Sequence, residues 1–146
     1  MLVALDSNII VYMLDPVYPE HVYCQYVSKL SKDFILCINP TVVHEAYHTL
    51  VYGQKWTRKD ARRKLEALIK HPYTLFYNQT RRITLEALRI AEKYGLGGRD
   101  SLIITNYLLN NVRTMHTHDE EIKGIGEVEW RRWKIKFEDP IPANTK

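Results

Sequence analysis

The stretch that decides the fold is Met1-Leu2-Val3-Ala4-Leu5-Asp6-Ser7-Asn8, in which an apolar run leads directly into polar residues. Such a run, followed by turn formers, predicts a strand that is buried on both faces. In an open parallel sheet, a strand of this kind ends at the edge where ligands bind. Asp6 therefore either caps the helix that follows or serves as a metal ligand at this edge. Ser7 is the expected cap of that helix, which begins at Ile9.

Working outward, segments of strand and helix character alternate, which indicates an α/β domain with a parallel sheet. Further strands are expected at 34–38, 73–77 and 112–116, and helices at 9–14, 18–32, 39–52, 57–69, 78–94 and 100–110. The run 133–137 alternates between apolar and polar residues, so we expect a strand with one wet face at an edge of the sheet. Gly95 to Gly98 should end one helix and turn the chain.

A chain of 146 residues predicts one domain, which we expect to cover 1–138, with a proline-containing C-terminal tail at 139–146. No apolar stretch is long enough to span a membrane, and residues 1–14 lack the basic start of a signal peptide. Cys24 and Cys37 lack metal-site spacing, so reduced, buried thiols and a cytoplasmic location are expected. A net charge of +4 and a pI near 9.0 favour a polyanionic partner.

Four acidic residues occupy one kind of position, where a strand ends or a helix begins: Asp6, Glu45, Asp100 and Asp119. In a doubly wound sheet these places lie at one edge, at the carboxyl ends of the strands. Carboxylates gathered there repel one another unless a cation joins them, and oxygen ligands alone suit Mg²⁺ or Mn²⁺ rather than Zn²⁺. Such a site can hold one or two ions about 4 Å apart and hydrolyse a phosphodiester.

In this order and at these separations, the motifs resemble the signature of the PIN-domain family. The matching features are Asp6-Ser7-Asn8 after an apolar strand, Glu45 on an early helix, Asp100 followed by Ser-Leu-Ile-Ile, and Thr117-x-Asp119. The chain length and the order of elements are similar to those of the toxin ribonucleases of the VapC type. The resemblance extends over nearly the whole chain, residues 1–137.

The resemblance implies a three-layer α/β/α domain with a central parallel sheet and a Mg²⁺- or Mn²⁺-dependent endoribonuclease activity. It also implies a homodimer and a cognate antitoxin protein, as in a type II toxin–antitoxin pair. The residues that match the family's motifs are the acids Asp6, Glu45, Asp100 and Asp119, with Asn8, Thr117 and Glu121 as supporting groups. Ile122 stands where many members carry an aromatic residue after Glu121. An RNA-processing nuclease outside any toxin pair is the alternative.

Two basic stretches, 55–64 and 130–136, are candidates for contact with single-stranded RNA because they combine arginines with aromatic residues. Arg58 and Arg62 lie in the first stretch, and Arg99, beside Asp100, is a third candidate for phosphate contact. The alternative for the first stretch is a solvated helix face. The alternative for the second is an edge strand protected by lysines.

A rival hypothesis comes from His44-Glu45-Ala46-Tyr47-His48, a literal H-E-x-x-H motif. Two histidines at i and i+4 share a helical face and can bind Zn²⁺, with the glutamate as general base of a metallopeptidase. The sequence shows no clear third ligand. The zinc hypothesis also leaves Asp6, Asp100 and Asp119 without a role, so it is the lesser alternative.

Overall fold

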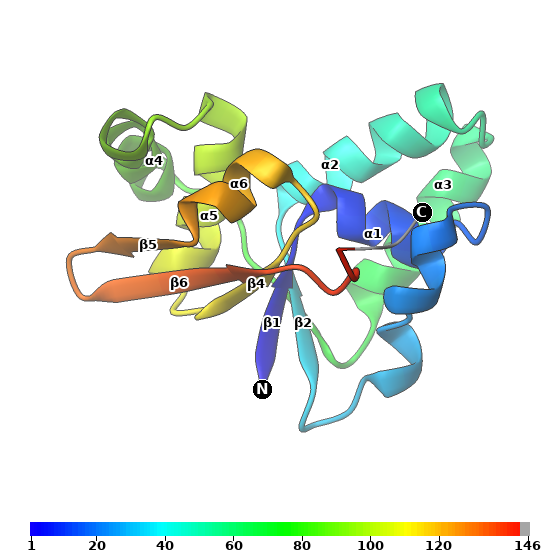
Figure 1. The fold of residues 1–146 in the computed structure, drawn as a ribbon. Coiled ribbons are helices and arrows are strands. Elements are labelled where there is room, and N and C mark those ends of the chain that lie inside the picture. Colours follow the sequence, from blue (N-terminus) through cyan, green and yellow to red (C-terminus); the bar gives the residue numbers. More distant parts are fainter. Residues whose placement is uncertain (144–146) are drawn as a thin grey trace.

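A computed structural model of the chain, which describes residues 1–143, contains one six-stranded sheet (Figure 1). The strands are β1 (Leu2–Leu5), β2 (Ile35–Ile38), β3 (Thr74–Phe76), β4 (Thr114–His116), β5 (Glu127–Trp130) and β6 (Trp133–Glu138). They lie in the order β3-β2-β1-β4-β6-β5, and every neighbouring pair is parallel except β5 and β6. The expected α/β class with a central, mostly parallel sheet is therefore confirmed.

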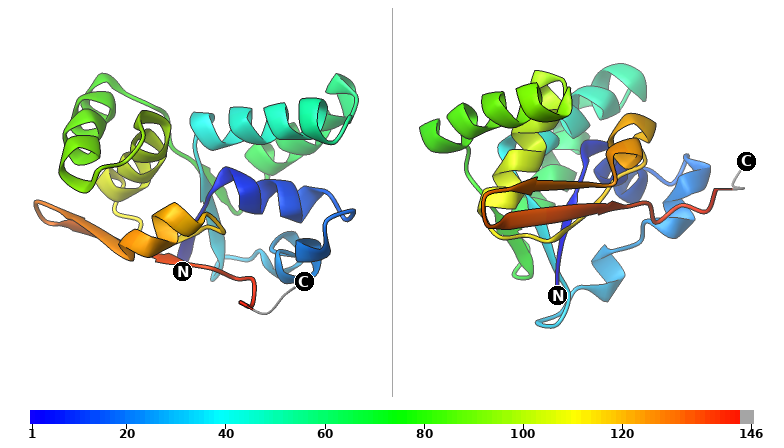
Figure 2. Two further views of the ribbon diagram at one scale, coloured as in Figure 1. Left: turned by 45° about the horizontal axis from the view of Figure 1, so that its top comes forward. Right: turned by 60° about the vertical axis from the view of Figure 1, so that its left-hand side comes forward.

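Helices join all successive strands except β5 and β6, which a short turn connects, and they cover both faces of the sheet (Figure 2). They are α1 (Ser7–Leu14), α2 (Pro40–His48), α3 (Arg58–Lys70), α4 (Arg81–Tyr94), α5 (Gly98–Leu109) and α6 (Glu120–Ile125), with a π-helical turn at Thr49–Gly53. The chain first moves outward from β1 through β2 to β3, and then returns to the other side of β1 through α4 and α5. The strand order therefore reverses between β1 and β4, which is where ligands bind in doubly wound sheets.

The core lies on both faces of β1, whose Val3, Ala4 and Leu5 are buried as the opening stretch predicted. On one face α5 contributes Tyr107, which is completely buried and donates its hydroxyl proton to the Leu5 carbonyl at 2.6 Å. Burying that hydroxyl without a partner would cost about 1–3 kcal/mol, so this bond fixes α5 against the end of β1. The C-terminal part of α5, where Tyr107 lies, is therefore held against the end of β1.

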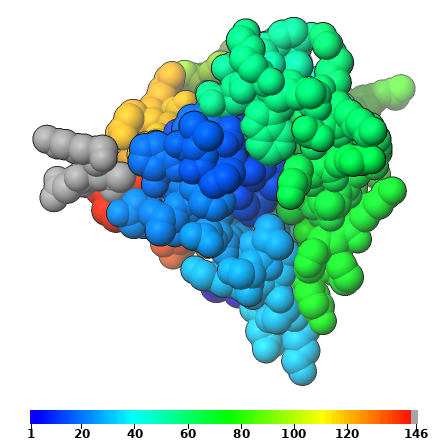
Figure 3. All heavy atoms as spheres, turned by 90° about the vertical axis from the view of Figure 1, so that its right-hand side faces the viewer, coloured from blue at the N-terminus to red at the C-terminus, as the bar shows by residue number. Residues whose placement is uncertain are grey.

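The single helix expected over 18–32 is wrong, because the chain forms two short 3₁₀ turns there, Pro19–Tyr23 and Val27–Lys29. The apolar spacing that suggested a helix does not mark a buried face, since Val22 and Val27 are exposed. The buried residues of this segment are instead Cys24 and Tyr26, which lie between the turns. Figure 3 views the side of the molecule on which this segment packs beside α1.

The C-terminal part differs from expectation in three ways. The sequence reasoning missed the short elements α6 and β5, and it placed β6 at an edge, whereas β6 lies between β4 and β5. Its polar face is wet because Lys134 and Lys136 are exposed on that face, while Ile135 is buried on the other. The start of the expected tail is packed: Ile141 is buried, and Asp139 accepts hydrogen bonds from His118 and Lys123.

Residues 144–146 of that tail lie outside the described part of the chain. The domain boundary at 138 stays a prediction. The turn at Gly95 is confirmed as a left-handed helix C-cap, with φ of 68°. No helix within residues 1–143 combines the length and the apolar character that crossing a membrane requires.

Candidate active site

The site lies where the strand order reverses, at the adjacent carboxyl ends of β1 and β4. Leu5 and His116 are register partners, so the next residues of the two strands meet beyond them. The Thr117 hydroxyl donates to Asp6 Oδ2 at 2.6 Å and accepts a bond from the Asp119 backbone N–H at 3.1 Å. Thr117 is completely buried and thus links the two acidic residues.

Asp6 is both a helix cap and part of this acidic edge. It is the N-cap of α1, and its Oδ1 accepts a hydrogen bond from the Ser7 backbone N–H at 2.8 Å. The expectation that Ser7 caps the helix is therefore wrong, because the helix begins at Ser7, two residues earlier than the apolar pattern suggested. A carboxylate can satisfy the open N–H groups of a helix and still present oxygens to a ligand.

Burial is the main reason why the pKa of Asp6 is raised from 3.8 to about 6. The hydrogen bonds from Thr117 and Ser7 act in the opposite direction, because they stabilise the carboxylate. The negative charges of Asp100 and Glu45 raise the pKa further. Two acidic side chains, Asp100 and Glu45, therefore lie close enough to Asp6 to affect its pKa.

Asp100 lies in the first turn of α5, next to the Gly97 N-cap, which has no side chain to satisfy the helix. Burial raises the pKa of Asp100, and the charges of Asp119, Glu45 and Glu121 raise it further, while Arg99 lowers it. Asp100 therefore lies within electrostatic range of Asp119 and Glu45, and of Glu121, which the sequence motifs selected as a supporting group. Asp119 itself caps α6, with its Oδ1 accepting from the Ile122 N–H at 3.0 Å.

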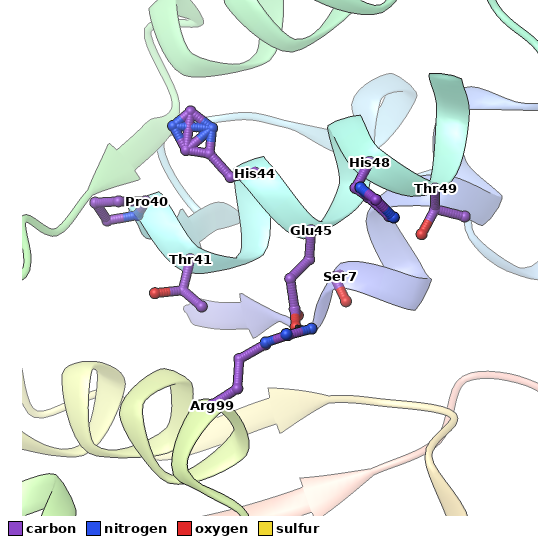
Figure 4. A pocket seen from close by; sticks show the side chains of 8 residues that line it. All are labelled: Ser7, Pro40, Thr41, His44, Glu45, His48, Thr49 and Arg99. Carbon is purple, nitrogen blue, oxygen red and sulfur yellow. Dashed lines mark hydrogen bonds and ion pairs between the residues drawn. The ribbon is translucent and has the colours of Figure 1, made fainter. Parts of the chain in front are cut away.

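Glu45 extends from α2 toward α5, where Arg99 Nη1 donates to its Oε2 at 2.9 Å (Figure 4). The Arg99 side chain is 72% exposed, and a pair of this kind contributes only about 0–1 kcal/mol. Both side chains line an open pocket of about 570 Å³. Its other lining residues are Ser7, Pro40, Thr41, His44, His48 and Thr49. Nothing in the sequence selected Thr41 or Thr49, since neither is acidic or belongs to one of the motifs.

The donors of this edge suit a hard divalent cation, because they are carboxylate oxygens together with the Oδ1 of Asn8, a buried acceptor without a hydrogen-bond partner. Within residues 1–143, no three His, Cys, Asp or Glu side chains stand close enough together to form a ready-made metal site. Three of the acids accept hydrogen bonds from protein groups: Asp6 from Ser7, Glu45 from Arg99 and Asp119 from Ile122.

The H-E-x-x-H motif does not form a zinc site in the described structure. Figure 4 shows the His44 ring on the opposite side of α2 from the Glu45 carboxylate. The His48 ring packs 4.8 Å from the Tyr52 ring, measured between centroids. With no third ligand in residues 1–143, the zinc hypothesis has no structural support.

The two arginines selected from the first basic stretch do not reach the acidic residues. Arg58 donates to the Tyr52 hydroxyl at 3.2 Å, and Arg62 pairs with Glu66 at 3.0 Å. Both line a separate groove between α2 and α3, which shares His44 with the pocket at Glu45. Their contact with substrate stays a prediction.

The fold and the acidic edge together define a doubly wound α/β domain with carboxylates at its switch point. The family model described as "PIN domain" matches residues 3–128, so the chain belongs to the PIN domain family. The resemblance seen in the sequence motifs is thereby confirmed. A comparison with curated proteins found no match.

Several solved structures have the same fold, and three of them illustrate it. VapC20 of Mycobacterium tuberculosis, a toxin that cleaves the sarcin–ricin loop, matches with a TM-score of 0.71 at 11% identity, covering 88% of this chain and 98% of that one. VapBC2 from Rickettsia felis, bound to a promoter DNA fragment, matches with a TM-score of 0.66 at 19% identity, covering 95% of this chain and 98% of that one. DNA-bound VapBC from Salmonella typhimurium matches with a TM-score of 0.62 at 21% identity, covering 97% of this chain and 100% of that one. At these identities, the likeness establishes the fold.

Proposed function

We propose that the chain is a Mg²⁺- or Mn²⁺-dependent endoribonuclease whose acidic site consists of Asp6, Glu45, Asp100 and Asp119. The observation that supports this most is the linkage at the switch point, where Thr117 joins Asp6 to Asp119. Asp100 adds to it, since its pKa responds to both Asp119 and Glu45. A structural role alone does not explain why four carboxylates gather at one edge, because their charges oppose one another there.

A bound divalent ion would supply an activated water and neutralise the charge of a phosphodiester. The protein's own groups have separate tasks. The Ser7 N–H and the Thr117 hydroxyl hold the Asp6 carboxylate in a fixed orientation. Arg99 holds Glu45, and because this pair is weak and exposed, its guanidinium can move to a phosphate when RNA arrives. Asn8 and Glu121 support the site as acceptors.

RNA is the proposed substrate because the chain is basic and Arg99 lies beside its acidic site. The similar VapC20 is a toxin that cleaves the sarcin–ricin loop, an activity of that protein which we extend to this chain as a proposal. The net charge of +4 favours a phosphate backbone as partner. Both cysteines are free and buried, which fits a protein that works in the cytoplasm, where thiols remain reduced.

The test is cleavage of single-stranded RNA in Mg²⁺ or Mn²⁺, with EDTA as the metal-free arm. We expect wild type to cut RNA only with metal, and Asp6→Asn to lose activity. A matched control is Glu120→Gln, since Glu120 is an exposed acid one residue from Asp119 whose side chain is 83% exposed. Equal products at equal rates from wild type and Asp6→Asn would refute the site. Activity that survives EDTA would refute the proposed metal dependence.

We further propose that the nuclease is the toxin of a type II pair, acts as a homodimer and is neutralised by an antitoxin protein. The support is that the structures sharing its fold include toxin–antitoxin complexes. Expression of wild type should arrest growth, whereas Asp6→Asn should not, and co-expression of a short neighbouring reading frame should restore growth. RNA cleavage without growth arrest would indicate the alternative, an RNA-processing nuclease. Light scattering of the purified chain tests the dimer.

A further inference from the structure

A second basic surface lies at the other end of the sheet from the acidic site. It is a groove of about 310 Å³ lined by Asn111, Arg113, Arg132, Lys134 and Lys136. Arg113 directly precedes β4, whereas Thr117 and Asp119 follow it, so the groove adjoins the amino end of that strand. Below, these five residues are called the basic groove. They come from three places in the fold: the segment after α5, the turn between β5 and β6, and β6 itself.

The charge of the basic groove is largely uncompensated. Lys134 pairs with Glu127 at 3.0 Å and with Glu129 at 3.4 Å. Within the described residues, none of the other three cations forms an ion pair, and no acidic side chain lines the groove. A concave surface with three free cations concentrates positive potential where an anion can enter.

The side chains of the basic groove are also positioned. The Arg132 guanidinium lies over the Trp133 ring, 4.8 Å from its centroid, and the Trp133 side chain is buried in the core. Asn111 adopts a left-handed backbone with φ of 61°, so the turn that carries it has a defined shape. Stacking on a fixed ring reduces the freedom that a guanidinium loses when it binds a phosphate.

Protection of an edge strand, the alternative that the sequence left open, does not explain these cations. β6 is not at an edge, because β4 and β5 flank it on both sides. The strand at the edge is β5, whose exposed charges are Glu127 and Glu129. The free cations of the groove therefore need another explanation.

We propose that the basic groove binds phosphates of the same single-stranded RNA whose scissile bond lies at the acidic site, a proposal that rests on the proposed function. Guanidinium groups donate paired hydrogen bonds to two oxygens of a phosphate, and the Asn111 amide adds a neutral donor. Asp119 comes six residues after Arg113. At about 3.3 Å per extended residue, the Cα atoms of these two residues are at most about 20 Å apart. The three residues of β4 lie between the two sites and span about 10 Å, so a long RNA should gain more from the groove than a dinucleotide does.

The first experiment measures binding of a fluorescent single-stranded RNA in EDTA, so that no cleavage occurs. The variant is Arg113→Ala with Lys136→Ala, and the matched control is Lys29→Ala with Lys32→Ala, which removes equal charge from two exposed lysines outside the groove. We expect the groove variant to bind about tenfold more weakly. Its plot of log affinity against log salt should be shallower by about 1.4, since each lost phosphate contact contributes about 0.7. The control should stay close to wild type.

An affinity and a salt slope equal to those of the control would overturn the proposal, as would RNA binding too weak to measure in wild type. The groove would then suit a different polyanion, such as an acidic protein. Thermal melting of each variant checks that the fold is retained, which is expected because both Arg113 and Lys136 are exposed.

The second experiment separates this proposal from the proposed function. With metal, the groove variant should show a raised KM on a long RNA and an unchanged KM on a dinucleotide. If the protein binds RNA through the groove but never cleaves it, the proposed nuclease function is refuted and RNA binding by the groove is supported. If the protein cleaves RNA, and the groove variant and the control have the same KM on long RNA, then RNA binding by the groove is refuted and the proposed nuclease function is supported.

Discussion

Replacing Asp6 with Asn should make the folding stability of the chain less dependent on pH. Asp6 is 5% exposed, and its pKa in the folded protein is about 6, against 3.8 as its ordinary value. The folded state therefore binds this proton more tightly than the unfolded state does. Stability from this group is present below pH 3.8 and is lost as the pH rises through about 6.

The full cost of ionising Asp6 in the folded state is about 3 kcal/mol, because each pKa unit corresponds to about 1.4 kcal/mol. About 2 kcal/mol of this is lost between pH 4.5 and 7.5. Asn cannot ionise, so the variant lacks this loss. Its amide can still accept from the Ser7 N–H and face the Thr117 hydroxyl, which preserves much of the local geometry.

The assay is urea unfolding in EDTA at pH 4.5 and 7.5, for wild type, Asp6→Asn and the control Asp33→Asn. Asp33 is an exposed acid outside the site. We expect the difference in unfolding free energy between the two pH values to change by about 2 kcal/mol in Asp6→Asn and to stay as in wild type in the control. Comparing the change between the two pH values within each protein removes any effect of the Asn substitution on stability that does not depend on pH. The same pH dependence in all three proteins would refute a destabilising, buried carboxylate at Asp6.

Four further predictions concern single residues. Asp100→Asn should leave the metal-free protein as stable or more stable, and reduce the rise in melting temperature caused by Mn²⁺; an unchanged rise would remove Asp100 from the ligands. Arg99→Gln should change the unfolding free energy by less than about 1 kcal/mol yet raise KM for RNA, and an unaltered KM would exclude phosphate contact. Tyr107→Phe should cost about 1–3 kcal/mol in urea unfolding because the buried Leu5 carbonyl loses its donor, and a neutral result would contradict that bond. Gly95→Ala should cost about 1 kcal/mol in the same assay because φ is 68°, whereas a gain would contradict the left-handed cap.

The buried strands and the alternation of strands and helices could be predicted from the sequence, because burial directly determines where apolar residues occur along the chain. The apolar run before Asp6 must be a buried strand, and in the structure Val3, Ala4 and Leu5 are buried. The alternation of strands and helices then predicts a parallel sheet, whose carboxyl ends meet at one edge. Placing Asp6 and Asp119 close together needs only this topology.

The errors arose where tertiary contacts decide the local structure. The helix expected over 18–32 was wrong because the buried residues, Cys24 and Tyr26, are set by their contacts and not by helical period. The Tyr26 hydroxyl lies 2.6 Å from His116 Nδ1, ninety residues away in the sequence. The position of β6 could not be found either, since the partner strand β5 has only four residues and gave no signal.

Within the site, the sequence predicted the acids, Thr117 and Arg99 as site residues, but not the contacts that Thr117 and Arg99 make with the acids. No local pattern connects Arg99 to Glu45, which are separated by fifty-four residues and meet only through the packing of α2 and α5. The sequence offered two alternative roles for Asp6, helix cap or metal ligand, but these roles do not exclude one another. The structure shows one carboxylate that caps α1 and faces other acids, and burial affects its pKa more than those acids do.

The central claim is that the acids act as one unit in RNA cleavage, and single-turnover rates test it most directly. The proteins are wild type, Asp6→Asn, Asp119→Asn and the double variant, each saturated with Mn²⁺ and one RNA substrate. Residues that act as a unit give non-additive losses. We expect each single variant to lose at least about a hundredfold in rate, and the double variant to be no slower than the slower single variant. Losses that multiply, or a single variant at the wild-type rate, would contradict a shared site.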